Sequence, residues 1–124
     1  MIGAAGRFAA RAYWRMALPH AHPALPIDVK PLGGALPGAR STALFKTDEL
    51  EVMHLVLHAG KALPAHKVPG EITVQCIEGI IDFSADGRVC TLGAGQLLYL
   101  PGGVVHSLVG VGDASALLTI VLRK

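Results

Sequence analysis

Short runs of alternating apolar and polar positions recur along most of this chain. Residues 50–58 alternate between two faces, and residues 71–84 form a longer run that Gly79 interrupts. Runs of this length, bounded by glycine, proline and small polar residues, are typical of β-strands. After residue 27 the sequence has no convincing 3.6-residue period of a core helix. The pattern therefore predicts an all-β domain.

Further strands are expected on both sides of these two runs. Asp86 and Gly87 predict a hairpin turn that pairs Cys90 with Phe83. Glycine- and proline-rich loops are expected at residues 32–38 and 59–64. About eight or nine short strands without a core helix predict a closed double-sheet jelly roll. The predicted strands cover residues 41–46, 50–58, 71–84, 88–92, 97–100, 104–109 and 114–122, after a short extended piece at 27–29.

The most informative stretch runs from residue 95 to residue 106. Residues 97–100 are a short apolar run with one aromatic side chain, which is typical of a buried strand. Pro101 and the two glycines after it favour a tight turn with positive φ angles. His106 then lies in an apolar strand at residues 104–109, where a buried imidazole needs a hydrogen-bond partner or a metal.

Gly95, Pro101, Gly103 and His106 have the spacing of the second motif of the cupins, and the stretch resembles that motif. One position departs from the family pattern, because Gly110 stands where the family usually has an asparagine. The resemblance implies a cupin barrel, which is a double-stranded β-helix or jelly roll with its site inside the barrel.

The first cupin motif is expected upstream, and Gly60, His66 and Gly79 match its spacing. The gap between Gly79 and Gly95 is as short as the usual gap of the family. The two motifs cover residues 60–106, and the strand pattern extends the resemblance to residues 40–122. Two motifs at matched spacing in one small all-β chain specify the fold, so we expect a cupin barrel.

Composition agrees with a single small domain. The chain has 124 residues, of which 52% are hydrophobic and 16% charged, with 15 glycines and 8 prolines. A chain of this length folds as one domain with a substantial core. We expect residues 27–124 to form one barrel domain, preceded by a flexible or arm-like segment at residues 1–26.

The charge distribution argues against a nucleic-acid partner. The formal net charge is +2, and three arginines before residue 28 carry +3, so the remaining eight Lys and Arg against nine Asp and Glu give −1. No basic stripe with interleaved aromatics follows. The sequence also lacks an apolar stretch long enough to span a membrane, and two cysteines do not make a disulfide framework. We therefore expect a cytoplasmic protein with both thiols reduced and buried.

The first 26 residues have features of their own. Arg7, Arg11 and Arg15 fall on one helical face, which favours a short frayed helix. We expect native translation to start at Met16, which would make the first fifteen residues an extension. His20 and His22 resemble a metal-binding pair, but their flanking prolines favour an arm-like segment without a metal.

The resemblance to cupins implies a divalent-metal site inside the barrel, with three ligands from the first motif and a histidine from the second. His66 and His106 match two of these four positions, whereas Val68 and Ile72 occupy the other two. Imidazole ligands suit zinc, iron, manganese or nickel. We therefore predict a weak metal site at His66 and His106, with the two side chains facing each other across the barrel interior.

Four other polar residues are alternative ligands. Glu71 and Gln75 alternate with Ile72 along the strand, so a regular strand points them away from the cavity. A twist or bulge before them would reverse this orientation for one of them. His54 and His58 share one face of their strand. We expect a surface or packing role for all four.

Two functions are compatible with these residues. In the first, the chain is a metal-dependent enzyme acting on a small organic molecule, with His66 and His106 as ligands and water or Gln75 completing the shell. In the second, the barrel is a metal-free pocket or sensor for a small apolar or aromatic molecule. We favour a weak metal site of unassigned activity. The predicted pocket residues are Val68, Ile72, Val74, Gln75 and Cys76.

The apolar content also predicts a homodimer. Both faces of residues 50–58 carry apolar side chains, which is unusual for a solvated antiparallel sheet. The face turned from the cavity would then pack on a second subunit, with residues 18–30 crossing over to cover it. The alternative is that this arm folds back on its own barrel.

Overall fold

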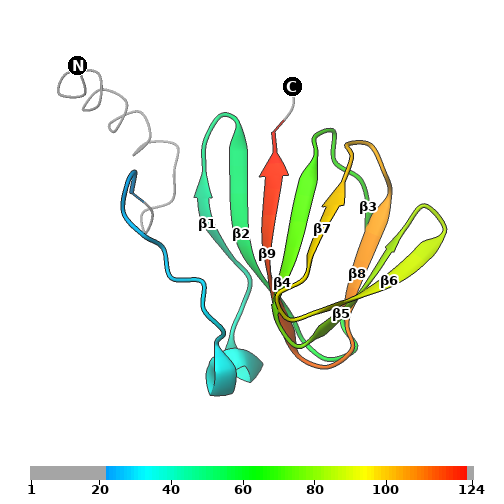
Figure 1. The fold of residues 1–124 in the computed structure, drawn as a ribbon, viewed down its shortest axis with the longest axis horizontal. Helices are drawn as coiled ribbons and strands as arrows, with labels where there is room; N and C mark the ends of the chain where they lie inside the picture. Colours follow the sequence, from blue (N-terminus) through cyan, green and yellow to red (C-terminus); the bar gives the residue numbers. More distant parts are fainter. Residues whose placement is uncertain (1–21, 123–124) are drawn as a thin grey trace.

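The structure, a computed structural model, describes residues 22–122 and consists of two antiparallel sheets packed face to face (Figure 1). The five-stranded sheet contains, in spatial order, β1 (Thr42–Lys46), β2 (Leu50–Leu57), β9 (Ala114–Val121), β4 (Ile72–Glu78) and β7 (Leu97–Leu100). The four-stranded sheet contains β3 (Ala62–His66), β8 (His106–Gly110), β5 (Ile80–Ala85) and β6 (Arg88–Gly93). The predicted all-β jelly roll is confirmed.

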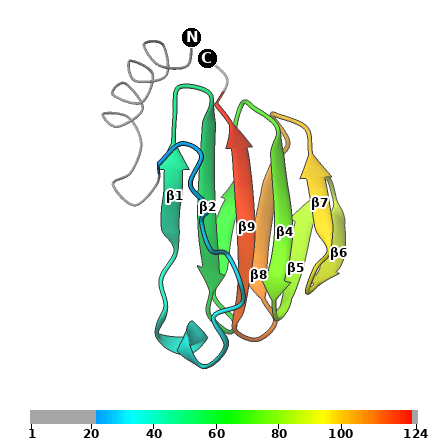
Figure 2. The same ribbon diagram turned by 60° about the vertical axis from the view of Figure 1, so that its left-hand side comes forward.

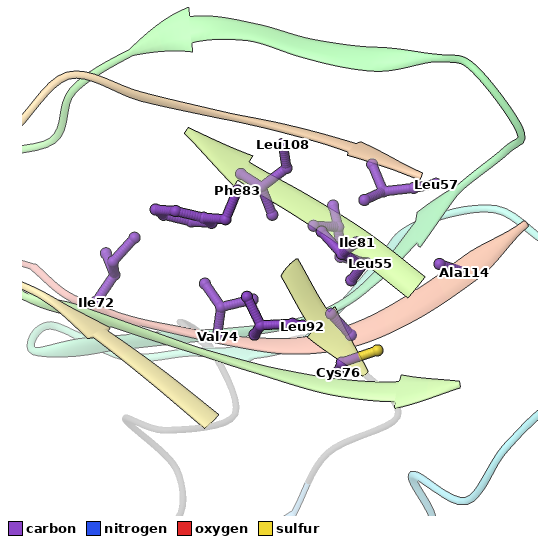
Figure 3. Packing of buried hydrophobic residues seen from close by; sticks show 11 residues of the cluster. Leu55, Leu57, Ile72, Val74, Cys76, Ile81, Phe83, Leu92, Leu108 and Ala114 are labelled. Atoms are coloured by element: carbon purple, nitrogen blue, oxygen red, sulfur yellow. The ribbon is translucent and has the colours of Figure 1, made fainter. Parts of the chain in front are cut away.

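Alternation along the strands produces one core between the two sheets. Every second residue of β4 from Ile72 to Cys76 is buried, and β5 buries Ile81 and Phe83 in the same way. Figure 3 shows these side chains meeting between the sheets. Each fully buried large apolar side chain stabilises the fold by about 1.5–3 kcal/mol. The core cluster consists of Leu55, Leu57, Ile72, Val74, Cys76, Ile81, Phe83, Leu92, Leu108, Ala114 and Ala116.

The chain passes from one sheet to the other at Gly79, between β4 and β5. The φ angle of Gly79 is +79°. A Cβ atom there would lie 2.4 Å from the carbonyl oxygen of Asp113 and 2.8 Å from Cα of Ala114. The ladder between β4 and β9 also shifts register just before this residue. The interruption of the strand pattern at Gly79 therefore marks a close approach of two backbone segments.

The β5–β6 hairpin has the predicted turn. Asp86 and Gly87 have φ angles of +52° and +73°, as a two-residue type I′ turn requires, and Phe83 pairs with Cys90 as expected. Cys76 is buried but Cys90 is exposed, so the prediction that both thiols are buried is wrong for Cys90. The cause is that β6 is an edge strand and the hairpin projects beyond the facing sheet (Figure 1).

Three local predictions are wrong. Residues 62–64, expected in a loop, belong to β3, whose register against β8 shifts between Leu63 and His66. Residues 33–38, also expected in a loop, form a short 3₁₀ helix, Gly33–Gly38. β7 is not a buried strand, because Leu97 and Tyr99 are 65% and 58% exposed on the outer face of this edge strand.

Residues 22–40 fold back over the outer face of the five-stranded sheet (Figure 2). The amides of Leu32 and Gly33 donate hydrogen bonds of 2.8 and 3.0 Å to the carboxylate of Glu78 at the end of β4. Ser115 Oγ on β9 donates to the same carboxylate at 2.6 Å. Leu36, within this segment, is buried. The arrangement agrees with the alternative in which the arm covers its own barrel.

Glu78 makes the attachment of this segment sensitive to pH. Desolvation alone would raise its pKa, but the hydrogen bonds from Ser115, Leu32 and Gly33 and the nearby His54 hold the pKa below the ordinary value of 4.5. A lowered folded-state pKa adds stability that is fully present above pH 4.5 and is lost as the pH falls through the folded value.

We therefore expect Glu78→Gln to lower the free energy of unfolding by about 1–2 kcal/mol at pH 7, because it removes charge-assisted hydrogen bonds. The difference from the wild-type protein should shrink as the pH falls below 4.5. Urea denaturation at a series of pH values measures both effects. Glu49→Gln, at an exposed residue, is the control, and an equal effect of the two substitutions would contradict the role of Glu78.

The predictions for the first 21 residues lie outside the described residues. They are the frayed helix with Arg7, Arg11 and Arg15, the alternative start at Met16, and His20 of the histidine pair. Within residues 22–122, no helix is long and apolar enough to cross a membrane.

Candidate functional site

His66 ends β3 and His106 begins β8, and the two residues are direct partners in the ladder between these strands. Their ring centroids are 4.4 Å apart, with the ring planes at 53°. The expectation that they face each other across the barrel interior is wrong, because β3 and β8 are neighbours in one sheet. The two imidazoles still meet at one end of the barrel. We call this end, formed by His66, His106 and the β5–β6 hairpin, the mouth.

Backbone carbonyl groups fix the tautomer of both imidazoles. His66 Nδ1 lies 3.0 Å from the carbonyl oxygen of Pro64, and His106 Nδ1 lies 2.9 Å from that of Val104. A carbonyl oxygen can only accept, so each Nδ1 carries the proton. In the neutral rings each Nε2 then keeps its lone pair, as in histidines that bind metal ions through Nε2.

The two rings differ in burial. His106 is only 4% exposed, and its ring stacks on Phe83 with centroids 5.7 Å apart and planes within 6° of parallel. His66 is exposed. The pair therefore lies at the boundary between the apolar core and the solvent. The imidazole of His106 is held by the core, and that of His66 is accessible to solvent.

The glycine corner before β8 places His106. Gly103, with φ of +80°, donates its amide proton to the carbonyl oxygen of Val68 at 2.8 Å. A Cβ at Gly102 would lie 2.0 Å from the carbonyl oxygen of Pro69. Only glycine permits this approach of the corner to the segment after β3. The two motifs recognised in the sequence are therefore in contact here.

The predicted pocket residues on β4 are divided between its two faces. Ile72, Val74 and Cys76 point into the core. Gln75 lies on the opposite, outer face, and Val68, which precedes β4, is half-buried and packs against the core. Burial raises the pKa of the Cys76 thiol, which makes this thiol a packing group rather than a nucleophile. Val68 and Ile72 thus put apolar side chains where the cupin resemblance implies ligands.

The alternative ligands lie away from the imidazole pair. Glu71 accepts a hydrogen bond of 2.9 Å from the hydroxyl of the exposed Tyr99, and this bond raises the pKa of Tyr99. The burial pattern of β4 places Gln75 on the outer face, apart from the other predicted pocket residues of this strand. In the part of the chain that the structure describes, no three His, Cys, Asp or Glu residues are grouped to hold a metal ion.

His54 and His58 lie on the outer face of the five-stranded sheet, and His58 contacts the segment that covers this face. His54 is 8% exposed, and its Nε2 is buried without a hydrogen-bond partner. His58 Nε2 lies 3.0 Å from the carbonyl oxygen of Ala39, and its Nδ1 lies 4.0 Å from Asp113. Their positions agree with the surface or packing role expected for both residues.

A groove of about 690 Å³ lies at the mouth and was not indicated by the sequence patterns. Ser84 and Ser107 are direct partners within it and alternate with the core residues Phe83 and Leu108, so they lie on the outer face of the four-stranded sheet. This pairing depends on β5 and β8 being neighbours, which sequence periodicity does not specify. The groove is lined by Ala65, residues 84–89 and residues 103–107.

Comparison with known proteins gives a family match over more than half of the chain. The family model described as "Cupin domain" matches residues 53–122, a range that includes both histidines and the glycine corner. No curated protein matches the sequence.

Several solved structures share the fold. A conserved protein of unknown function from Streptococcus pyogenes is 21% identical, with a TM-score of 0.69 over 86% of this chain and 95% of that chain. A cupin superfamily protein from Desulfitobacterium hafniense is 21% identical, with a TM-score of 0.68 over 80% and 95% of the two chains. KdgF from Halomonas sp. is 17% identical, with a TM-score of 0.62 over 79% and 87%. These likenesses show the fold alone.

Proposed function

The chain belongs to the cupin domain family, and on that premise we propose that it binds a small organic molecule at the mouth of its barrel. The imidazole pair of His66 and His106 is the polar anchor of this site and also holds a divalent ion weakly. One observation supports the proposal above the others: the two rings lie 4.4 Å apart, and each has its Nδ1 proton on a backbone carbonyl, which leaves both Nε2 atoms for a ligand.

The residues fit a metal ion only in part. His66 and His106 supply two imidazole ligands, and Val68 and Ile72 supply none. Zinc sites in proteins use three or four protein ligands, so an ion at this pair depends on solvent or the bound molecule for the rest of its shell. Zinc, iron, manganese and nickel all accept imidazole. When bound, such an ion provides Lewis acidity.

The second candidate function is a metal-free binding or sensor barrel. The observation that favours it is the burial of Ile72 and the packing of Val68 against the core. Apolar side chains at these two ligand positions cannot complete the coordination shell of an ion. In this case the two imidazoles act only as hydrogen-bonding groups for the small molecule.

A metal titration distinguishes the two functions. We expect protein without a histidine tag to bind zinc or nickel at one site, and the double variant His66→Ala, His106→Ala to weaken this binding by more than about tenfold. Isothermal titration calorimetry and elemental analysis measure the affinity and the stoichiometry. His58→Ala, on the outer side of the barrel, is the control. No binding by the wild-type protein would favour the metal-free barrel.

We also propose that the protein is a homodimer, with residues 1–26 as an arm before a barrel domain at residues 27–124. The support comes from exposed apolar residues on the outer surface, among them Leu97 and Tyr99 on β7. Light scattering at micromolar concentration tests this, and a monomer mass would contradict it. The unpaired thiols Cys76 and Cys90 support a reducing, cytoplasmic location.

A further inference from the structure

One row of residues crosses the four-stranded sheet at the mouth. Arg88 pairs directly with Ala85, and Ala85 pairs with His106. His106 pairs in turn with His66. Residues that pair directly in an antiparallel sheet present their side chains on the same face. Ala85 packs against the core and His106 stacks on Phe83, so this is the inner face of the sheet.

Arg88 brings a free positive charge to this row. Its side chain is exposed, and within residues 22–122 the ion pairs are Lys30–Asp28 and His58–Asp113, so its guanidinium group has no carboxylate partner there. A guanidinium group stays charged at every physiological pH and can bind a carboxylate through two parallel hydrogen bonds. Arg88 is therefore available to an anion at the mouth.

The groove at the mouth leaves room for a small molecule between Arg88 and His106, because both residues line it. Adjacent strands are about 4.8 Å apart, so β6 and β8 are separated by about 10 Å. The residue between them, Ala85, has only a methyl side chain, which packs against the core. A small carboxylic acid could therefore place its carboxylate at Arg88 and the rest of the molecule over Ala85, within reach of His106.

We propose that the molecule bound at the mouth is a carboxylate, held at its charged end by Arg88 and at its other end by the imidazole pair. This inference rests on the proposed function, because it names the class of ligand for the same site. A carboxylate fits better than a phosphate. Arg88 is the one arginine of the row, and the carboxylate of Asp86 in the adjacent turn opposes a second negative charge on the ligand.

Binding of benzoate and of its uncharged analogue benzamide tests the proposal. In nuclear magnetic resonance titrations of the full chain, we expect benzoate to shift the amide signals of residues 85–88 and 106 and benzamide to bind at least about tenfold more weakly. Arg88→Gln should weaken benzoate binding by a similar factor. Arg40→Gln, which removes an exposed arginine of the covering segment, should leave it unchanged.

Three results would overturn the carboxylate site: equal binding of benzoate and benzamide, unchanged benzoate binding by Arg88→Gln, or tighter binding of phenyl phosphate at the same residues. A zinc titration of the same samples separates this inference from the metal site. Benzoate binding that needs Arg88 without any zinc binding supports the carboxylate site and removes the metal. Zinc binding at His66 and His106, with benzoate binding unchanged by Arg88→Gln, supports the metal site and removes the carboxylate site.

Discussion

Replacing Gly79 with alanine is expected to lower the free energy of unfolding by about 2–6 kcal/mol, because two costs add. A φ angle of +79° is strained for any residue with a Cβ. The new methyl group would also lie 2.4 Å from the carbonyl oxygen of Asp113 and 2.8 Å from Cα of Ala114. Both of these are backbone atoms, which cannot move without disturbing the start of β9.

Gly87→Ala is the matched control for this substitution. Gly87 has a similar φ angle of +73°, but a Cβ there meets no atom within 4 Å. We expect only the strain cost, about 1 kcal/mol. Urea denaturation of both variants measures the difference. Equal losses of stability would show that the steric contact at Gly79 relaxes and that this corner is less tightly packed than the structure indicates.

The glycine positions were predictable because a positive φ angle or a close backbone approach permits only glycine, so the residue itself is visible in the sequence. The family spacing identified Gly79 and Gly103, and the structure gives both a positive φ angle. Gly110 departs from the asparagine usual in the family, and a Cβ there would lie 2.5 Å from the carbonyl oxygen of Gly112. In this chain an asparagine would therefore displace the β8–β9 turn.

Strand exposure was harder to predict than strand position. Residues 97–100 were placed correctly as a strand, but apolar character does not tell which face of an edge strand meets solvent. Leu98 and Leu100 pack against the core, whereas Leu97 and Tyr99 are exposed. β3 was missed because Pro64 is unusual in a strand and the register of this strand against β8 is shifted.

The candidate site was predictable only as a pair of residue positions. Motif spacing found His66 and His106, but their contact within one sheet depends on the strand order β3-β8-β5-β6. The same order brings Arg88 into line with them, although Arg88 belongs to no motif and is 22 residues from His66 in the sequence. Periodicity identifies which residues of one strand share a face, whereas strand order determines which residues of different strands lie side by side.

Phe83→Ala is expected to lower the free energy of unfolding by about 3–5 kcal/mol, which is usual for a large aromatic residue in a core. Phe83 is 1% exposed, lies between the two sheets (Figure 3) and has one of the largest fully buried side chains of the described residues. Its loss leaves a cavity that the surrounding strands cannot close. Phe45→Ala, at a half-buried residue of β1, should cost less, and urea denaturation compares the two.

Phe83→Leu separates the role of this ring in the site from its role in the core. Leucine fills most of the cavity, so we expect a loss of only about 1.5 kcal/mol and a folded protein. The stacked contact with His106, now at 5.7 Å between centroids, is removed, and the imidazole loses the flat surface that orients it. Zinc affinity and benzoate affinity should then both fall in a protein that remains folded. Unchanged affinities for both would show that the hydrogen bond from Nδ1 to Val104 orients His106 without help from the aromatic ring.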